Sequence, residues 1–127
     1  MKRLIWSFCA VFIFIITCSC FANLIDNDLP EGTETVSFVE LGSGKCIPCK
    51  QMQPIVDKIE EEYAGKVKVV FHDVWKEDGK KYGQAYNVRM IPTQIFLDKE
   101  GNEIFRHEGF FAKEKIEKIL AEAGVSK

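Results

Sequence analysis

The chain has 127 residues, of which 46% are hydrophobic, and a formal net charge of −2. This length and apolar content fit one small domain with a hydrophobic core and argue against a second domain. Positive and negative charges are mixed along the sequence without a basic block, which excludes a nucleic-acid-binding surface.

The N-terminal residues resemble an export signal. Lys2 and Arg3 form a positively charged start, and Leu4–Ile16 is an apolar run that one serine interrupts. The run is shorter than the roughly 20 residues that a membrane-spanning helix needs, which favours a signal peptide. Counted on to Phe21, it approaches spanning length, so an uncleaved anchor is the alternative.

The sequence beyond the apolar run divides into a short tether and a folded domain. Cleavage after Ala22 gives a signal peptide over residues 1–22. The tether, residues 23–35, is polar and rich in turn formers. The folded domain then spans residues 36–127.

Lipidation is a further alternative for the N-terminal segment, through Cys18 or Cys20, because the residues around them resemble a bacterial lipoprotein motif. With the signal removed, five cysteines fall to two or three, and the close pair of Cys46 and Cys49 remains. We expect an exported protein, in the periplasm or at the outer face of the cytoplasmic membrane. It contacts the membrane through its N-terminal segment alone. Disulfides can form and persist in such a compartment.

The first part of the domain predicts a strand, a helix and a second strand. Val36–Leu41 is a compact apolar run followed by glycines, which indicates a buried strand. After the cysteine pair, apolar residues spaced by three and four up to Tyr63 predict an amphipathic helix, which Gly65 ends. Because a helix connects the two strands, the second is expected to run parallel to the first.

The second half of the chain continues this alternation. The further elements are expected to be a strand over Lys66–Asp73, a short helix over Lys80–Tyr86, strands over Gln94–Leu97 and Glu103–His107, and a helix over Ala112–Ala123. The turn residues between the last two strands predict an antiparallel hairpin. The order β-α-β-α-β-β-α indicates an α/β fold with a mixed central sheet and helices on both of its faces.

Two cysteines, Cys46 and Cys49, stand at the junction between the first strand and the first helix. The N–H groups and the dipole at a helix N-terminus stabilise a thiolate, which is the form that attacks a disulfide. Cys49 lies one turn further on and can attack the resulting mixed disulfide, which releases the reduced substrate. This reasoning favours redox chemistry.

Two other uses of the cysteine pair remain open. A structural disulfide across so short a loop constrains the unfolded chain little and contributes little stability. A zinc site needs about four ligands, and neither a second cysteine pair nor the spacing of His72 and His107 supplies them. Trp75 and Phe110–Phe111 are interpreted as core or lid residues and not as a cofactor site.

The cysteine motif and a second motif together resemble thioredoxin. Cys-x-Pro-Cys-Lys stands at the helix start, Pro54 follows within the helix, and Ile91-Pro92-Thr93 precedes the hairpin. The similarity is ungapped over residues 39 to about 74 and resumes at the second motif. It implies a thioredoxin fold that is trimmed at its N-terminus.

The resemblance also implies roles for individual residues. Cys46 is the expected nucleophile, Cys49 the resolving thiol, and Pro92 a cis-proline beside their disulfide. A proline that merely starts a strand is the alternative at position 92. A cis peptide bond turns the backbone of Ile91 outward, where an extended substrate can pair with it. The expected substrate-binding residues are Ile47, Pro48, Ile91 and Thr93.

The sequence departs from thioredoxin at four positions around the pair. Glu40 stands where thioredoxin has a buried aspartate, and Phe71 replaces the lysine that faces this aspartate. Lys45 replaces the tryptophan before the first cysteine, and Ile47 replaces the glycine between the cysteines. These departures leave the redox direction open.

Glu40 lies six residues before Cys46, inside the first strand. One interpretation is a surface carboxylate at the end of a strand. The other is a partly buried carboxylate beneath the cysteine pair. Burial there would raise its pKa and let it take the proton of Cys49 as that thiol attacks.

We therefore expect an exported, monomeric thiol–disulfide oxidoreductase that uses its Cys46–Cys49 disulfide and no other cofactor. The resemblance is to reducing thioredoxins, so protein disulfides are the expected substrates, in cytochrome c maturation or in thiol repair. A membrane thiol-electron transporter is the expected electron donor. Two alternatives keep the same fold: a disulfide-donating oxidase, and a non-enzymatic module that binds Cu(I) or thiols.

Overall fold

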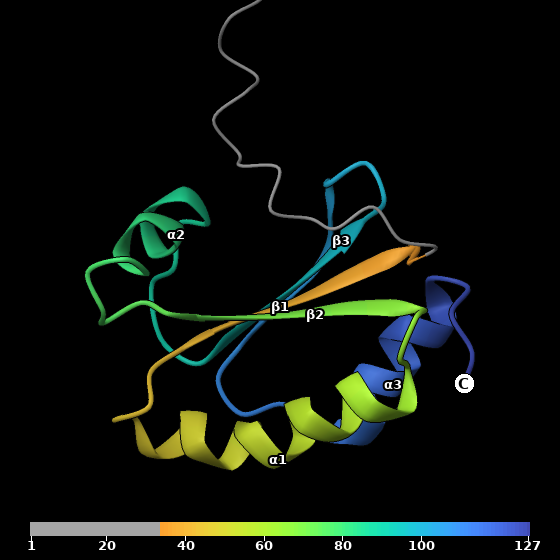
Figure 1. Cartoon of the computed structure of the whole chain (residues 1–127), viewed down its shortest axis with the longest axis horizontal. Helices are drawn as coiled ribbons and strands as arrows, with labels where there is room; N and C mark the ends of the chain where they lie inside the picture. The colour runs from red at the N-terminus through yellow and green to blue at the C-terminus, as the bar shows by residue number, and fades with distance from the viewer. Residues whose placement is uncertain (1–33) are drawn as a thin grey trace, which may run out of the picture. The chain divides into compact units, whose positions relative to one another are not determined.

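The computed structural model describes residues 34–127, so the predicted signal peptide, the cleavage and lipidation sites and most of the tether lie outside the described residues. The elements are β1 (Val36–Gly42), α1 (Ile47–Glu62), β2 (Val67–Asp73), α2 (Lys80–Ala85), β3 (Thr93–Asp98), β4 (Glu103–Glu108) and α3 (Lys113–Glu122), as Figure 1 shows. The predicted order β-α-β-α-β-β-α is confirmed. Among residues 34–127, no helix combines the length and hydropathy needed to span a bilayer.

The four strands form one mixed sheet in the order β2-β1-β3-β4. β1 pairs parallel with β2, beginning at Val36 opposite Val67, as the helical connection predicts. β1 pairs antiparallel with β3, and β3 forms the predicted antiparallel hairpin with β4. β1 is therefore an inner strand, and all seven of its residues are buried.

The two faces of the sheet carry separate hydrophobic clusters. Figure 1 shows α1 and α3 together on one face and α2 on the other, which confirms the predicted helices on both faces. Because side chains alternate along a strand, Val36 and Phe38 of β1 pack in the cluster that includes α1 and α3. Val39 and Leu41 pack in the other cluster, against the α2 side. Glu40 shares the parity of Phe38 and therefore faces α1.

Glycines follow the two long helices at the positions where the sequence predicts their ends. Gly65 and Gly124 have φ values of 74° and 83°, which are left-handed conformations that glycine adopts without steric cost. Pro54 lies inside α1, and the helix continues past it to Glu62.

Candidate active site

A disulfide bond joins Cys46 and Cys49, whose Cα atoms are 5.2 Å apart. Cys46 is the N-cap residue of α1, and its sulfur accepts a hydrogen bond from the backbone N–H of Cys49 at 3.3 Å. Pro48 occupies the first turn of α1, where a residue without an N–H loses no helical hydrogen bond. One of the two reactive cysteines is therefore the N-cap residue of α1, and the backbone N–H of the other donates to it.

The turn before Cys46 is fixed by the ends of two neighbouring strands. The Cys46 N–H donates to the Ser43 carbonyl oxygen at 3.1 Å. The Gly44 N–H donates to the Asp73 carboxylate, at the end of β2, at 3.2 Å. The Asp73 carboxylate also accepts the Trp75 N–H at 3.1 Å, so one side chain holds both loops that flank the disulfide.

The charge around the pair favours a negatively charged sulfur. The first turn of α1 contains no acidic side chain, and Lys45 and Lys50 flank the motif. The positive end of the helix dipole and the N–H of Cys49 both act on the sulfur of Cys46. When the disulfide is reduced, these groups stabilise the thiolate of Cys46 over its thiol.

A loop with a cis peptide bond between Ile91 and Pro92 leads into β3. The hydroxyl of the buried Thr93 donates to the Met90 carbonyl oxygen at 2.7 Å and closes this loop. The carbonyl oxygen of Pro92 accepts the N–H of Gly109 at 2.7 Å. The loop is therefore anchored to β3 and to the segment after β4.

The strand register brings this loop to the same edge of the sheet as the disulfide. Leu41 of β1 lies opposite Thr93 of β3, so Pro92 lies next to Gly42, the last residue of β1. A methyl group at Gly42 would lie 3.3 Å from the sulfur of Cys49. The two sequence motifs, more than forty residues apart, thus meet at the C-terminal end of β1.

Glu40 is buried below this edge, with 1% of its surface exposed. The interpretation of Glu40 as a surface carboxylate is therefore wrong. It lies on the α1 face of β1, two residues before Gly42, where the sulfur of Cys49 approaches. Burial raises the pKa of Glu40 to about 8, and the amide of Gln94 opposes part of this increase.

Phe71 occupies the position opposite Glu40 on β2. A methyl group placed at Gly42 would lie 3.3 Å from the ring of Phe71 and 3.3 Å from the sulfur of Cys49, so the ring and the sulfur flank the same point. Phe71 is 41% exposed. An aromatic ring, and not a cation, therefore lies beside Glu40 and the sulfur of Cys49 on the β2 side.

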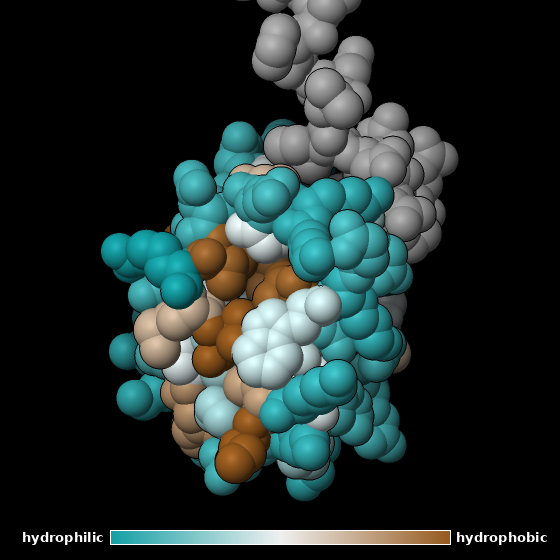
Figure 2. All heavy atoms as spheres, turned by 90° about the vertical axis from the view of Figure 1, so that its left-hand side faces the viewer, coloured by the Kyte–Doolittle hydropathy of each residue, from teal (hydrophilic) through white to brown (hydrophobic). Residues whose placement is uncertain are grey.

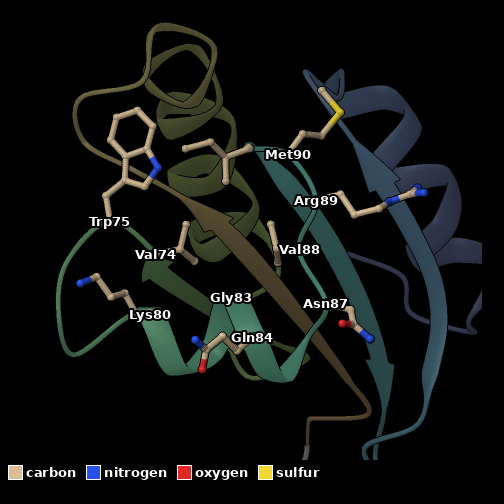
Figure 3. A pocket seen from close by; sticks show the side chains of 10 residues that line it. Val74, Trp75, Lys80, Gly83, Gln84, Asn87, Val88, Arg89 and Met90 are labelled. Carbon is tan, nitrogen blue, oxygen red and sulfur yellow. The ribbon is translucent and has the colours of Figure 1, made fainter.

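An open cavity of about 590 Å³ lies beside the disulfide edge, between α2 and the loop before β3. Figure 3 shows Trp75 on one side of it and Met90 on the other. Figure 2 shows apolar surface gathered on this face of the molecule, within a hydrophilic rim. The residues that line the cavity are Val74, Trp75, Lys80, Gly83, Gln84, Asn87, Val88, Arg89, Met90 and Ile91.

The predicted substrate-binding residues differ in their exposure. Ile47 is 73% exposed, Pro48 is exposed, and Ile91 lines the cavity. Thr93 is fully buried, so any effect of its side chain on substrate passes through the loop that it closes. Their roles in binding substrate stay predictions.

Sequence reasoning missed Gln94. It lies directly opposite Glu40 in the pairing of β1 with β3 and has no exposed surface. The available signal was an amide at the start of an apolar strand. Only the register of the two strands reveals that this amide faces the carboxylate.

A disulfide that caps a helix, next to a cis-proline loop on a mixed sheet, defines a thiol–disulfide oxidoreductase with a thioredoxin fold. Comparison with known families and proteins supports the same class. The family model described as a thioredoxin-like domain matches residues 29–124. The chain belongs to the thioredoxin family.

Two curated relatives illustrate the similarity. Thioredoxin C-2 of Corynebacterium nephridii is 34% identical over 83 residues, which cover 65% of this chain and 74% of that protein. Thioredoxin of Porphyra purpurea is 32% identical over 98 residues, which cover 77% of this chain and 83% of that protein.

Solved structures share the fold. The germline-specific thioredoxin Deadhead of Drosophila melanogaster aligns with a TM-score of 0.61 at 25% identity, covering 70% of this chain and 81% of that one. A malarial protein aligns with a TM-score of 0.65 and is covered completely, over 72% of this chain. Its 17% identity supports the fold alone.

Proposed function

We propose that this protein reduces disulfide bonds in other proteins, with Cys46 as the nucleophile. In the reduced state, the thiolate of Cys46 attacks one sulfur of a substrate disulfide. A mixed disulfide forms between Cys46 and the substrate, and the other substrate sulfur leaves as a thiolate that takes up a proton. The observation that carries this assignment is the position of the Cys46 sulfur, which caps α1 and accepts a backbone N–H.

In the second step, Cys49 resolves the mixed disulfide. Its thiol gives its proton to the carboxylate of Glu40, and the new thiolate attacks the sulfur of Cys46. The Cys46–Cys49 disulfide forms, the second substrate sulfur leaves as a thiolate that takes up a proton from solvent, and Glu40 returns its proton to solvent. Two electrons and two protons have then moved from the dithiol to the substrate. The proposed reaction draws on no cofactor other than the cysteine pair.

The apolar surface beside the disulfide supports an extended substrate segment with apolar side chains. Ile47 and Trp75 are exposed next to the two loops of the disulfide edge. The backbone of Ile91 precedes the cis-proline and is free of the β3 ladder, so it can pair with such a segment. We propose that the protein binds its substrates in this way as a monomer.

Trapping experiments test the assignment of the two cysteines. Cys49→Ser should accumulate a mixed disulfide through Cys46 with a disulfide-bonded protein such as insulin, whereas Cys46→Ser should accumulate none. If neither variant forms a mixed disulfide while the wild-type pair binds Cu(I) tightly, the protein is a metal- or thiol-binding module and the proposal is wrong.

The reduction potential tests the direction of the reaction. A value near thioredoxin's, about −270 mV, supports a reductase, and a value near −120 mV would identify a disulfide donor. Equilibration of the Cys46–Cys49 pair with glutathione or thioredoxin of known potential gives this number. Ile47 and Lys45, which differ from thioredoxin's residues, stand next to the nucleophile and make this measurement the most informative one.

We further propose that the protein acts outside the cytoplasm, in cytochrome c maturation or thiol repair, with a membrane thiol-electron transporter as its electron donor. The charged start and apolar run of residues 2–16 support export. Mass spectrometry of the mature N-terminus distinguishes cleavage after Ala22 from lipidation at Cys18 or Cys20 and from retention. Recovery of the protein in the cytoplasmic fraction with an intact N-terminus would contradict export.

A further inference from the structure

Two buried polar side chains face each other beneath the disulfide edge. Glu40 of β1 and Gln94 of β3 are opposite residues in the antiparallel pairing, and they have 1% and 0% of their surface exposed. Side chains at directly opposed positions project to the same face with Cβ atoms about 5 Å apart. The carboxylate and the amide are therefore neighbours on the face that α1 covers.

Both side chains end in buried polar atoms that have no hydrogen-bond partner at ordinary bonding distance among residues 34–127. These atoms are the two carboxylate oxygens of Glu40 and the amide oxygen and nitrogen of Gln94. Burial of a polar group without a partner is costly, and burial of a charged one costs more. The two residues are thus the partners available to each other.

Among residues 34–127, the other neighbours of Glu40 supply no fixed charge. Phe71 faces it from β2, and Cys49 approaches from α1. The next residue in the same row is His107 on β4, opposite Gln94. Its Nε2 lies 3.1 Å from the Phe110 carbonyl oxygen, and its ring stacks on Phe111 at 4.1 Å.

We infer that Gln94 is the positioning residue for Glu40, and that its amide sets the pH at which Glu40 accepts the proton of Cys49. This inference rests on the proposed role of Glu40 in the second step of disulfide exchange. Phe71, on β2, supplies no cation to Glu40. The amide of Gln94, on β3, is the polar group that faces the carboxyl group instead.

An amide suits this task because it satisfies both forms of a carboxyl group. Its NH₂ group donates to the ionised carboxylate, and its carbonyl oxygen accepts from the protonated acid. A lysine would stabilise the ionised form alone. The influence of the Gln94 amide lowers the pKa of Glu40, against the increase that burial causes, so Gln94 holds the carboxyl group within reach of neutral pH.

The test compares Gln94→Met, which removes the amide at nearly constant volume, with the control Ile95→Val. Ile95 is the next residue of β3 and packs in the cluster on the opposite face. Carbon-13 NMR of labelled glutamate gives the pKa of Glu40 directly. The signal of Glu40 is identified because it is missing from the spectrum of Glu40→Gln. Gln94→Met should raise this pKa by roughly one unit, and Ile95→Val should leave it unchanged.

The pH profile of substrate reduction supplies a second readout. In Gln94→Met, the part of the profile where the rate rises with pH should move to higher pH by the same shift as the pKa of Glu40. In the Glu40→Gln background, Gln94→Met should leave the pH profile unchanged. A pKa of Glu40 equal to wild type in folded Gln94→Met would overturn the inference. If this variant does not fold, Gln94→Leu carries the same expectation.

The two readouts separate this inference from the proposed function. If the pKa of Glu40 shifts and the rate profile does not, Gln94 positions Glu40 but Glu40 is not the proton acceptor. If the rate profile shifts while the pKa of Glu40 does not, the amide acts on another group and the inference is wrong.

Discussion

Phe71 lies directly opposite Glu40 in the parallel pairing of β1 and β2, so a buried carboxylate has an aromatic ring as its neighbour on that side. Thioredoxin, which this chain resembles, places a lysine there. The exchange removes the charge that would stabilise an ionised carboxylate. Burial then dominates and raises the pKa of Glu40 to about 8.

Stability should therefore depend on pH through Glu40. The folded protein keeps a proton on Glu40 that the unfolded chain, with an ordinary pKa of 4.5, gives up. The free energy of unfolding should fall as pH rises from about 4.5 to about 8, by on the order of 4 kcal/mol over the full range. Urea denaturation of the oxidised protein across this range measures the loss.

Glu40→Gln is the control for this prediction, because it keeps the shape of the side chain and cannot ionise. Its stability should be nearly flat over the same range. The ion pairs of Glu62 with Lys113 and Lys127 lower the pKa of Glu62 to about 2, so its protonation affects stability at more acid pH. A fall of equal size in wild type and Glu40→Gln would show that another group titrates.

Restoration of a cation opposite Glu40 should reverse the effect of Phe71. In Phe71→Lys, an ammonium group next to the carboxyl group should lower the pKa of Glu40 by about one to three units. The fall in stability between about pH 4.5 and 8 should shrink accordingly. The matched control is Phe71→Leu, which removes the ring without adding charge, and carboxyl NMR measures both pKa values. Equal pKa values in the two variants would mean that the lysine does not reach Glu40.

The sequence predicts the elements of this fold better than it predicts the contacts of its buried polar residues. Apolar periodicity and turn residues mark every strand and helix, and Gly124 marks the end of α3, because these signals act over a few residues. Glu40 and Gln94 are separated by 54 positions and meet through the register of β1 with β3. No local pattern encodes that register, so the carboxylate could be proposed as buried but its amide partner could not be identified.

The exposed surface beside the disulfide could not be predicted from the sequence for a similar reason. Trp75 could be interpreted from sequence as a core or lid residue, since aromatic side chains are common in both settings. It is 57% exposed and lines a cavity together with Met90 from a loop fifteen residues later. The position of that loop depends on the anchoring of the cis-proline segment, which is a tertiary contact.

The hydroxyl of Thr93 should matter for substrate binding although it is buried. Thr93→Val keeps the volume of the side chain but removes the donor to the Met90 carbonyl oxygen. We expect a loss of about 1–2 kcal/mol in the free energy of unfolding and an increase in KM, because the loop that carries Ile91 loses its closing hydrogen bond. Thr93→Ser, which retains the donor, should keep KM close to wild type. Equal KM values in Thr93→Val and wild type would show that the hydrogen bond that closes the loop does not affect substrate binding.

Two glycines on the α2 side of the molecule should respond in opposite ways to alanine. A methyl group at Gly79 would collide with the backbone carbonyl of Asp73, whose side chain holds the loops at Gly44 and Trp75. Gly79→Ala must displace this backbone, and we expect it to cost roughly 2 kcal/mol or more of stability and to weaken substrate reduction.

The matched variant is Gly83→Ala, inside α2. A methyl group there would lie 3.4 Å from the side chain of Val74, which is an ordinary van der Waals contact. Alanine also loses less backbone entropy than glycine in a helix, so Gly83→Ala should gain about 0.5–1 kcal/mol. Urea denaturation and insulin reduction, measured on both variants, check the pair. A stabilised Gly79→Ala, or equal losses in both variants, would contradict the idea that the Asp73 backbone fixes the loop beside the disulfide.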